Sequence, residues 1–174
     1  LPPGKQLEYL EGKRLSRKKI IECLAFCFMP NHFHLLIKQL EDKGISEFMR
    51  LIQNSYTRYF NTKYNEIGPL FQGQFKAVHI QDDRQLLHVS RYIHLNPYTS
   101  FLINDLLELR NYRFSSYGNY CNGKKSFIYE TQQILSYFSS PKDYEQFVTD
   151  RADYQRSLGE IKHLLFDSPT PEVG

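Results

Sequence analysis

Residues 29–36 read MPNHFHLL, and this short stretch decides how the chain is expected to fold. Pro30 and Asn31 are turn-forming residues that separate two apolar runs, IIECLAFCF at 20–28 and HFHLLIKQ at 32–39. The first run is continuous, as in a strand that is buried on both faces. Two strand-length runs around a short turn predict a β-hairpin.

The second strand of this hairpin carries two histidines at alternating positions. Side chains in a strand alternate between faces, so His32 and His34 share one face while Phe33 points to the other, into the core. Two neighbouring imidazoles can bind one cation, but the same spacing also fits a strand with two half-buried histidines. A third ligand nearby would favour the metal site.

A first helix is predicted after the hairpin, followed by an extended segment. Apolar residues recur at helical spacing over residues 47–63, and Ser46 precedes them as a plausible N-cap. Gly68 and Pro69 then break the helix. Strand character is predicted to return through Phe75, Val78 and Ile80.

A second helix is predicted over residues 82–96. Asp82 or Asp83 caps its start, and Pro97 is expected to end it because the residue before a proline disfavours the α conformation. Residues 108–125 read as a loop, and two or three short helices are predicted from residue 126 onward.

His88, Tyr92 and Asn96 lie four residues apart and therefore share one face of the second helix. The amide oxygen of Asn96 suits a hard cation, and a tyrosine beside it would aim its hydroxyl at whatever the cation polarises. The competing interpretation is plainer: Tyr92 is an amphipathic residue on a half-buried face, and Asn96 ends the helix. The spacing alone leaves both open.

Composition sets broad limits on the class of protein. A chain of 174 residues with 41% hydrophobic residues fits one domain, or one domain with an appendage, and its net charge of +3 permits nucleic-acid binding. Three cysteines without a CxxC pair favour a reducing cytoplasm over a disulfide framework. No run is long enough for a membrane span. The sequence begins without Met, so a further N-terminal segment is expected.

Four motifs, in this order, resemble the single-tyrosine His-hydrophobic-His transposases, and in particular the REP-associated tyrosine transposases. They are MPNHFHLLIKQ (29–39), GPLFQGQFKAVHI (68–80), RYIHLNPY (91–98) and YRFSSY (112–117). The resemblance runs from about residue 20 to about residue 120. It departs from the family at the start, because the first strand with its His-Val-Thr-x-Arg-like pattern is absent here.

The resemblance implies an α+β fold: a ferredoxin-like or RRM-like palm with a central antiparallel sheet and packed helices, plus a small C-terminal helical extension. It places the catalytic domain at residues 1–122 and the extension at 123–174. Carried over to matching positions, His32, His34 and Asn96 become metal ligands and Tyr92 the nucleophile. His88 is a possible auxiliary residue.

The implied activity is that of a metal-dependent endonuclease and strand transferase acting on single-stranded DNA next to hairpins formed by imperfect palindromes. Tyrosine has a pKa of about 10 and needs activation to attack at neutral pH. A Mg²⁺ or Mn²⁺ ion would polarise the phosphate, and the product would be a 5′-phosphotyrosine. A homodimer, with Tyr92 acting within or across subunits, is compatible with the sequence.

Six basic side chains are candidate phosphate contacts. Each of them, taken alone, can also be explained as a solvated surface charge. They are Arg50, Arg58, Lys76, Arg91, Arg110 and Arg113. The interleaved aromatic and basic residues from 110 to 120 suit base stacking but also a packed loop. Two other functions are open: a DNA-binding module of the same fold that no longer cuts, and a phosphodiesterase that uses water, with Tyr92 only positional.

Overall fold

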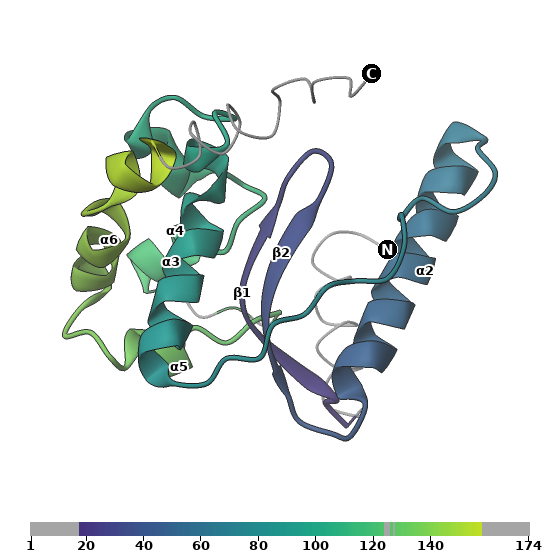
Figure 1. The fold of residues 1–174 in the computed structure, drawn as a ribbon, viewed down its shortest axis with the longest axis horizontal. Coiled ribbons are helices and arrows are strands. Elements are labelled where there is room, and N and C mark those ends of the chain that lie inside the picture. Colours follow the sequence, from purple (N-terminus) through teal and green to yellow (C-terminus); the bar gives the residue numbers. More distant parts are fainter. Residues whose placement is uncertain (1–17, 124–125, 127, 158–174) are drawn as a thin grey trace, which may run out of the picture. The chain divides into compact units, whose positions relative to one another are not determined.

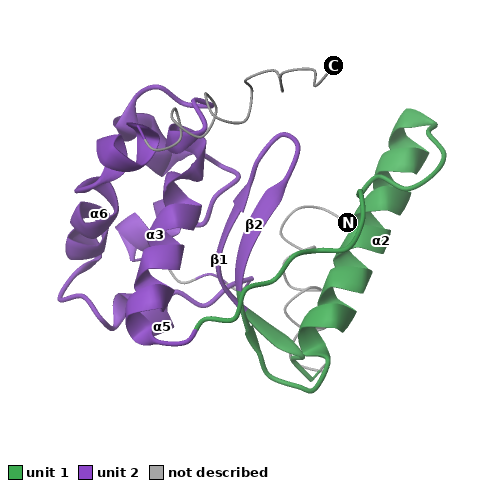
Figure 2. Cartoon of the chain, viewed as in Figure 1, with its two compact units in different colours: residues 1–22, 37–80 green, residues 23–36, 81–174 purple. Residues whose placement is uncertain are grey.

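The computed structural model describes residues 18–123, 126 and 128–157, and these form two compact units (Figure 2). Unit 1 contains residues 18–22 and 37–80, and unit 2 contains the other described residues, 23–36 and 81 onward. The predicted α+β class is confirmed, with an antiparallel sheet and packed helices (Figure 1). The predicted boundary at residue 122, between a catalytic domain and a C-terminal helical extension, stays a prediction. Residues 158–174 of the extension lie outside the described part.

The predicted hairpin is present, with β1 at Ile21–Phe28 and β2 at Phe33–Gln39. Its turn closes where the Met29 N–H donates to the His32 carbonyl at 2.8 Å. Among the described residues these two strands make up the sheet, so the larger sheet of a ferredoxin-like palm stays a prediction. Phe33 is half-buried rather than in the core, and its ring lies 6.3 Å from that of Phe28, which is 39% exposed.

The edge of β1 away from β2 is covered by a later segment of unit 2. Phe28 N–H donates to the Phe114 carbonyl at 2.8 Å, Ser116 N–H donates to the Phe26 carbonyl at 3.1 Å, and Cys27 forms an isolated antiparallel bridge with Ser115. Strand β1 therefore has backbone partners on both sides, which agrees with its continuous apolar sequence.

In unit 1, helix α2 spans Gly44–Tyr64 and begins earlier than predicted. Ser46 lies inside the helix. The N-cap residue of α2 is Lys43, which has a left-handed conformation (φ 57°), and no side chain caps the helix there. The start is fixed instead by Gly44, because a Cβ there would collide with the Ile20 carbonyl oxygen. That oxygen also accepts the Leu40 N–H at 3.1 Å.

The strand predicted through Phe75, Val78 and Ile80 is wrong. Residues 74–80 form no strand, and Val78 is 81% exposed. An extended apolar sequence becomes a strand only where a neighbouring strand supplies its backbone hydrogen bonds, and local pattern does not contain that information.

In unit 2, helix α3 spans Asp83–Thr99 and is capped as predicted, because the Asp82 carboxylate accepts the Gln85 N–H at 2.7 Å. The predicted end at Pro97 is wrong, since the helix continues to Thr99. Pro97 lies in the last turn, where its missing N–H removes a single helical hydrogen bond. The turn is completed beyond it, where Ser100 N–H donates to the Asn96 carbonyl at 3.0 Å.

The segment 108–125, predicted as a loop, contains two short helices in its described part, residues 108–123. The 3₁₀ helix η1 spans Leu106–Asn111, and α4 spans Tyr117–Asn122. Helices α5 (Gln132–Leu135) and α6 (Pro141–Thr149) follow and confirm the short helices predicted there. Figure 1 shows α3 between the strands and α6, so α3 is covered on both sides.

The core of unit 2 contains a chain of hydrogen bonds centred on the fully buried His94 of α3. The Phe26 N–H donates to Ser116 Oγ at 3.0 Å, and Ser116 Oγ lies 2.7 Å from His94 Nε2. On the other side, His94 Nδ1 lies 2.7 Å from the Tyr144 hydroxyl, which donates to Ser90 Oγ at 3.2 Å. Burial lowers the pKa of His94 to about 3, so the ring is neutral and one nitrogen donates while the other accepts.

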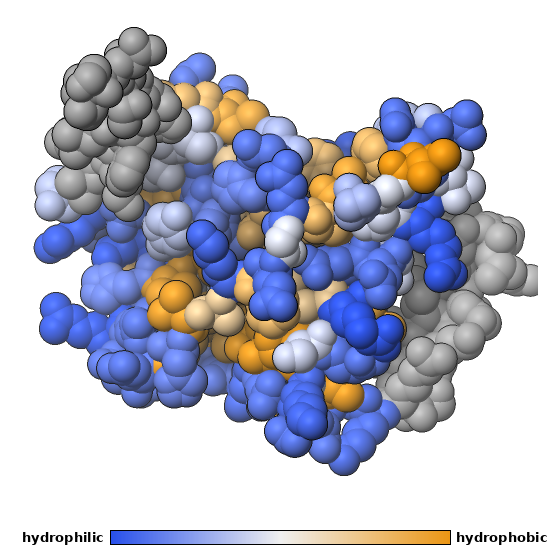
Figure 3. Space-filling view, turned by 45° about the vertical axis from the view of Figure 1, so that its right-hand side comes forward, coloured by the Kyte–Doolittle hydropathy of each residue, from blue (hydrophilic) through white to orange (hydrophobic). Residues whose placement is uncertain are grey.

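Among the described residues, no helix combines the length and the apolar character that a membrane crossing requires. The surface is mainly hydrophilic in Figure 3, but apolar side chains reach it in several places.

Tyr144→Phe is expected to lower the free energy of unfolding by about 1–3 kcal/mol, because it leaves a buried His94 nitrogen without a partner. Urea denaturation measures the change. The matched control is Tyr154→Phe, since Tyr154 is 61% exposed and its loss of a hydroxyl should change stability by about 0.5 kcal/mol or less. Equal effects of the two substitutions would contradict a structural role for the His94 hydrogen bonds.

Candidate active site

The two histidines of β2 lie side by side, as the strand alternation predicts. Their ring centroids are 4.9 Å apart and the rings are nearly perpendicular, at 88°. His32 is exposed, and its Nδ1 lies 2.6 Å from the Oδ1 of Asn31. An amide oxygen only accepts, so in this contact Nδ1 is the donor, and Nε2 is the nitrogen that would bind a metal. The sequence indicated Asn31 only as a turn residue.

Tyr92 of α3 packs directly against His34. Its ring centroid lies 5.5 Å from that of His34, with the rings at 80°. The side chain remains 49% exposed, so its hydroxyl is accessible to a large substrate. The contact between helix and strand that the sequence implied is therefore present within unit 2.

Asn96 lies one helical turn further along α3 and is only 6% exposed. It forms a hydrogen bond with His34, and its Nδ2 atom is buried without a hydrogen-bond partner among the described residues. A buried amide that is only partly satisfied costs stability, so its presence here calls for a functional explanation.

The electrostatic environment favours the neutral form of His34. Burial lowers the pKa of His34 below its ordinary value, the neighbouring His32 lowers it further, and the hydrogen bond with Asn96 acts in the opposite direction. Segments 23–40 and 84–104, which carry all four predicted site residues, contain no Asp or Glu. Among the described residues no group of three or more His, Cys, Asp or Glu side chains is placed to hold a metal. A metal here would therefore depend on the amide of Asn96.

Comparison with protein families shows a match to the family described as IS200-like transposases over residues 8–96, about half of the chain. The match contains both histidines, Tyr92 and, at its last position, Asn96. The chain belongs to the IS200-like transposase family. No curated protein and no solved structure matches the chain.

His88 of this transposase is exposed one helical turn before Tyr92. Its Nδ1 lies 2.6 Å from a guanidinium nitrogen of Arg91 and accepts its hydrogen bond. Desolvation lowers the pKa of His88, and the positive charges of Arg91, Arg84 and Arg151 lower it further. A neutral His88 is able to accept a proton, but its auxiliary role stays a prediction.

Arg91 is not free to contact phosphate. It is 6% exposed, donates to the Phe147 carbonyl at 3.2 Å, and its guanidinium lies 4.4 Å from the Phe147 ring centroid. These contacts attach α3 to α6. We therefore remove Arg91 from the set of proposed DNA contacts.

The other predicted phosphate contacts fall into two groups. Arg113 is exposed in unit 2, with its guanidinium 5.3 Å from the Phe114 ring, whereas Arg110 is engaged by Asn122. Arg50, Arg58 and Lys76 are exposed in unit 1, and Arg50 is paired with Glu47. Their roles toward DNA stay predictions.

The aromatic and basic segment 110–120 contains the end of η1, a short loop and the start of α4, and part of it is packed into the core. Tyr117 and Tyr120 are buried, and the Tyr120 hydroxyl donates to the Leu24 carbonyl at 2.7 Å. Sequence reasoning also missed Ser116 and Tyr144 as the partners of His94, because no local pattern indicates contacts between residues so far apart.

Arg91→Ala is expected to lower the free energy of unfolding by about 1–3 kcal/mol, because a buried, hydrogen-bonded charge is removed. Arg84→Ala is the control on the same helix, since Arg84 is exposed. Urea denaturation of both variants measures the difference. A stable Arg91→Ala protein with weakened DNA binding would instead make Arg91 a phosphate contact.

Proposed function

We propose that this transposase is a metal-dependent single-stranded DNA endonuclease and strand transferase that uses Tyr92 as its nucleophile. The supporting observation is the packing of Tyr92 against His34, beside His32 and with Asn96 one turn away. A phenol, two imidazoles and an amide oxygen at one place are the groups that attack on phosphorus requires. The proposed substrate lies next to a DNA hairpin formed by an imperfect palindrome.

The residues present fit a divalent cation. His32 and His34 would offer one ring nitrogen each, and Asn96 would offer its amide oxygen. The Nδ2 atom of Asn96 has no hydrogen-bond partner within the described part of the chain. Imidazole nitrogens are softer than the ligands Mg²⁺ prefers, so Mn²⁺ fits this set better than Mg²⁺. When bound, the cation would polarise the scissile phosphate and stabilise the charge that develops on it.

The chain's own residues supply the nucleophile and its orientation. The Tyr92 oxygen forms a bond to phosphorus while the bond from phosphorus to the 3′-oxygen breaks. The phenol loses its proton and the departing 3′-oxygen gains one, which leaves a free 3′-hydroxyl and a 5′-phosphotyrosine. Because one phosphate ester replaces another, a second 3′-hydroxyl can reverse the step and join a new strand without ATP.

The charge of the surrounding segments supports a polyanionic substrate. No carboxylate occurs in 23–40 or 84–104 to repel a phosphate or to neutralise the cation. The positive charge of a bound ion therefore remains available to the DNA.

Tyr92→Phe is expected to abolish a covalent adduct that resists denaturation, because the ring stays but the attacking oxygen is lost. The measurement uses hairpin-flanking oligonucleotides labelled at the 5′ or the 3′ end, and the adduct should carry the 3′ label. Tyr98→Phe on the same helix is the control. Cleavage at full rate by Tyr92→Phe would favour the phosphodiesterase that uses water, and binding without cleavage by the wild type would favour the silent binding module.

Removal of divalent metal by a chelator is expected to abolish the adduct, and Mn²⁺ should restore it at lower concentration than Mg²⁺. Asn96→Ala should weaken Mn²⁺ binding, measured by electron paramagnetic resonance, by about tenfold or more. His79→Ala is the control, because His79 is exposed in unit 1. Unchanged Mn²⁺ affinity in Asn96→Ala would contradict the assignment of Asn96 as a ligand.

A further inference from the structure

Helix α2 in unit 1 carries a shallow groove along one side, here called the α2 groove. Its lining residues are Ser55, Arg58, Tyr59, Thr62 and Lys63. They recur at spacings of three and four residues, so they form a continuous row along a rigid helix. The row combines two aliphatic hydroxyls, two cations and a tyrosine. None of these residues is among those of the candidate active site.

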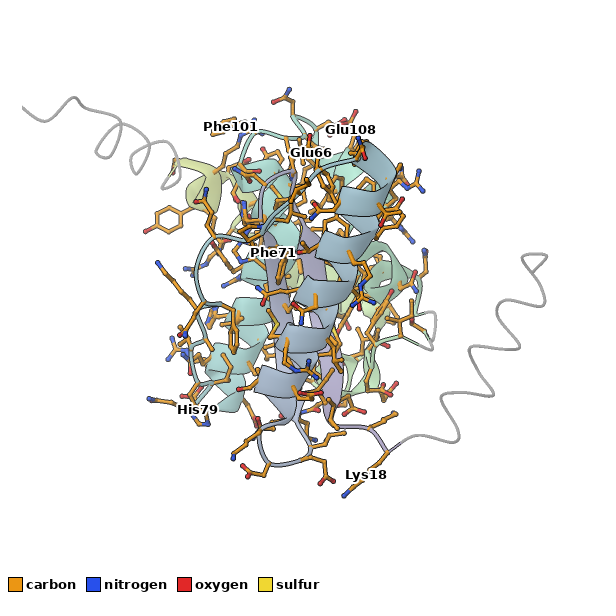
Figure 4. All side chains as sticks on the ribbon, turned by 90° about the vertical axis from the view of Figure 1, so that its right-hand side faces the viewer. Lys18, Glu66, Phe71, His79, Phe101 and Glu108 are labelled. Carbon is orange, nitrogen blue, oxygen red and sulfur yellow. The ribbon has the colours of Figure 1, made fainter. Side chains whose placement is uncertain are left out.

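Tyrosine rings at and beside the α2 groove are exposed to an unusual degree for an aromatic cluster. Tyr56, Tyr59 and Tyr64 are 49%, 56% and 54% exposed. Their positions are nevertheless fixed by contacts within unit 1, since Tyr56 lies 6.2 Å from Tyr59 and 6.1 Å from Phe71 between ring centroids. Figure 4 shows Phe71 beside α2 and Glu66 beyond one end of the helix. The rings are therefore held in place within unit 1 without being covered by its described residues.

The cations of the α2 groove lie among these rings. Lys63 Nζ is 5.5 Å from the Tyr59 ring centroid and 5.2 Å from that of Tyr64, and Arg58 is exposed. Residues 48–65 contain no Asp or Glu. The only carboxylates nearby in sequence are Glu47, which is paired with Arg50, and Glu66. The surface thus joins positive charge to flat, accessible rings.

We propose that the α2 groove binds single-stranded DNA, with a base stacked on Tyr59 and the backbone phosphates held by Arg58 and Lys63. Stacking accepts any base because each has a π-face, and cations that track the backbone are the second component of such surfaces. Ser55 and Thr62 add hydrogen-bond donors for phosphate oxygens. The inference rests on the proposed single-stranded DNA substrate and gives that strand a contact outside the active site.

Charge complementarity favours this occupant over an apolar protein surface. A groove that binds an apolar protein surface would be lined by aliphatic side chains, whereas all five lining residues here carry a hydroxyl or a charge. The surface that they expose in the groove is mostly carbon, which a stacked base would also cover. A second copy of the chain remains the alternative that the experiment excludes.

The test measures binding of a fluorescent oligothymidine of about 20 nucleotides, long enough for one such groove. Tyr59→Ala should weaken binding roughly tenfold or more, and Tyr59→Phe should retain it because the ring is kept. Arg58→Gln with Lys63→Gln should reduce the slope of log affinity against log salt by about 1.4, since each single-strand phosphate contact contributes about 0.7.

Lys142→Gln is the matched charge control, because Lys142 is exposed on α6 in unit 2. Circular dichroism confirms that each variant is folded. Wild-type affinity and salt slope in both the Tyr59→Ala and the Arg58→Gln/Lys63→Gln proteins would overturn the proposal. The proposal would also be overturned if these variants changed their oligomeric state, measured by sedimentation, while their DNA affinity stayed the same. That result would make the surface an interface between copies of the chain.

The adduct assay separates this inference from the proposed function. If the wild type forms the Tyr92 adduct while the α2 variants bind oligothymidine normally, the groove proposal fails and the function stands. If no adduct forms but binding depends on Tyr59 and Lys63, the proposed chemistry fails and the DNA surface stands.

Discussion

The hydrogen bond between His94 and Ser116 is the contact on which the active-site geometry depends. Ser116 also accepts the Phe26 N–H, so the pair connects helix α3 to strand β1. Residues two apart on a helix point about 200° away from each other. Anchoring His94 in the core therefore turns Tyr92 and Asn96, two residues before and after it, toward the opposite side. The buried imidazole sets the direction of both.

Neutral groups rather than carboxylates build the site, and this choice has an electrostatic consequence. His34 has a lowered pKa, and the segments around it contain no acidic residue. A carboxylate ligand would hold a cation more firmly but would offset its charge. In the proposed site, imidazole and amide ligands would leave that charge intact, which would favour the proposed polyanionic substrate. The proposed arrangement would therefore bind the metal less tightly and attract phosphate more strongly.

Local spacing predicted which side chains of the candidate site share a face, because each of its two halves is set by backbone periodicity. Alternation in β2 determines that His32 and His34 share a face, and the four-residue spacing on α3 does the same for Tyr92 and Asn96. The contact between Tyr92 and His34 was not contained in either pattern, and the family resemblance supplied it. Burial of Arg91 could not be predicted, because it depends on Phe147, which lies 56 residues later.

The end of α3, which the sequence predicted wrongly, is informative about the candidate site. Sequence rules end the helix at Asn96, yet Pro97 is tolerated inside it because unit 2 buries that turn and bonds continue beyond it. The extra turn keeps Asn96 helical and therefore on the same face as Tyr92. The Asn96 Nδ2 group is buried there without a partner in the part of the chain that the structure describes. Among the described residues this unpaired buried group costs stability. The proposed ligand role of the Asn96 amide oxygen, which lies at His34, would account for that cost.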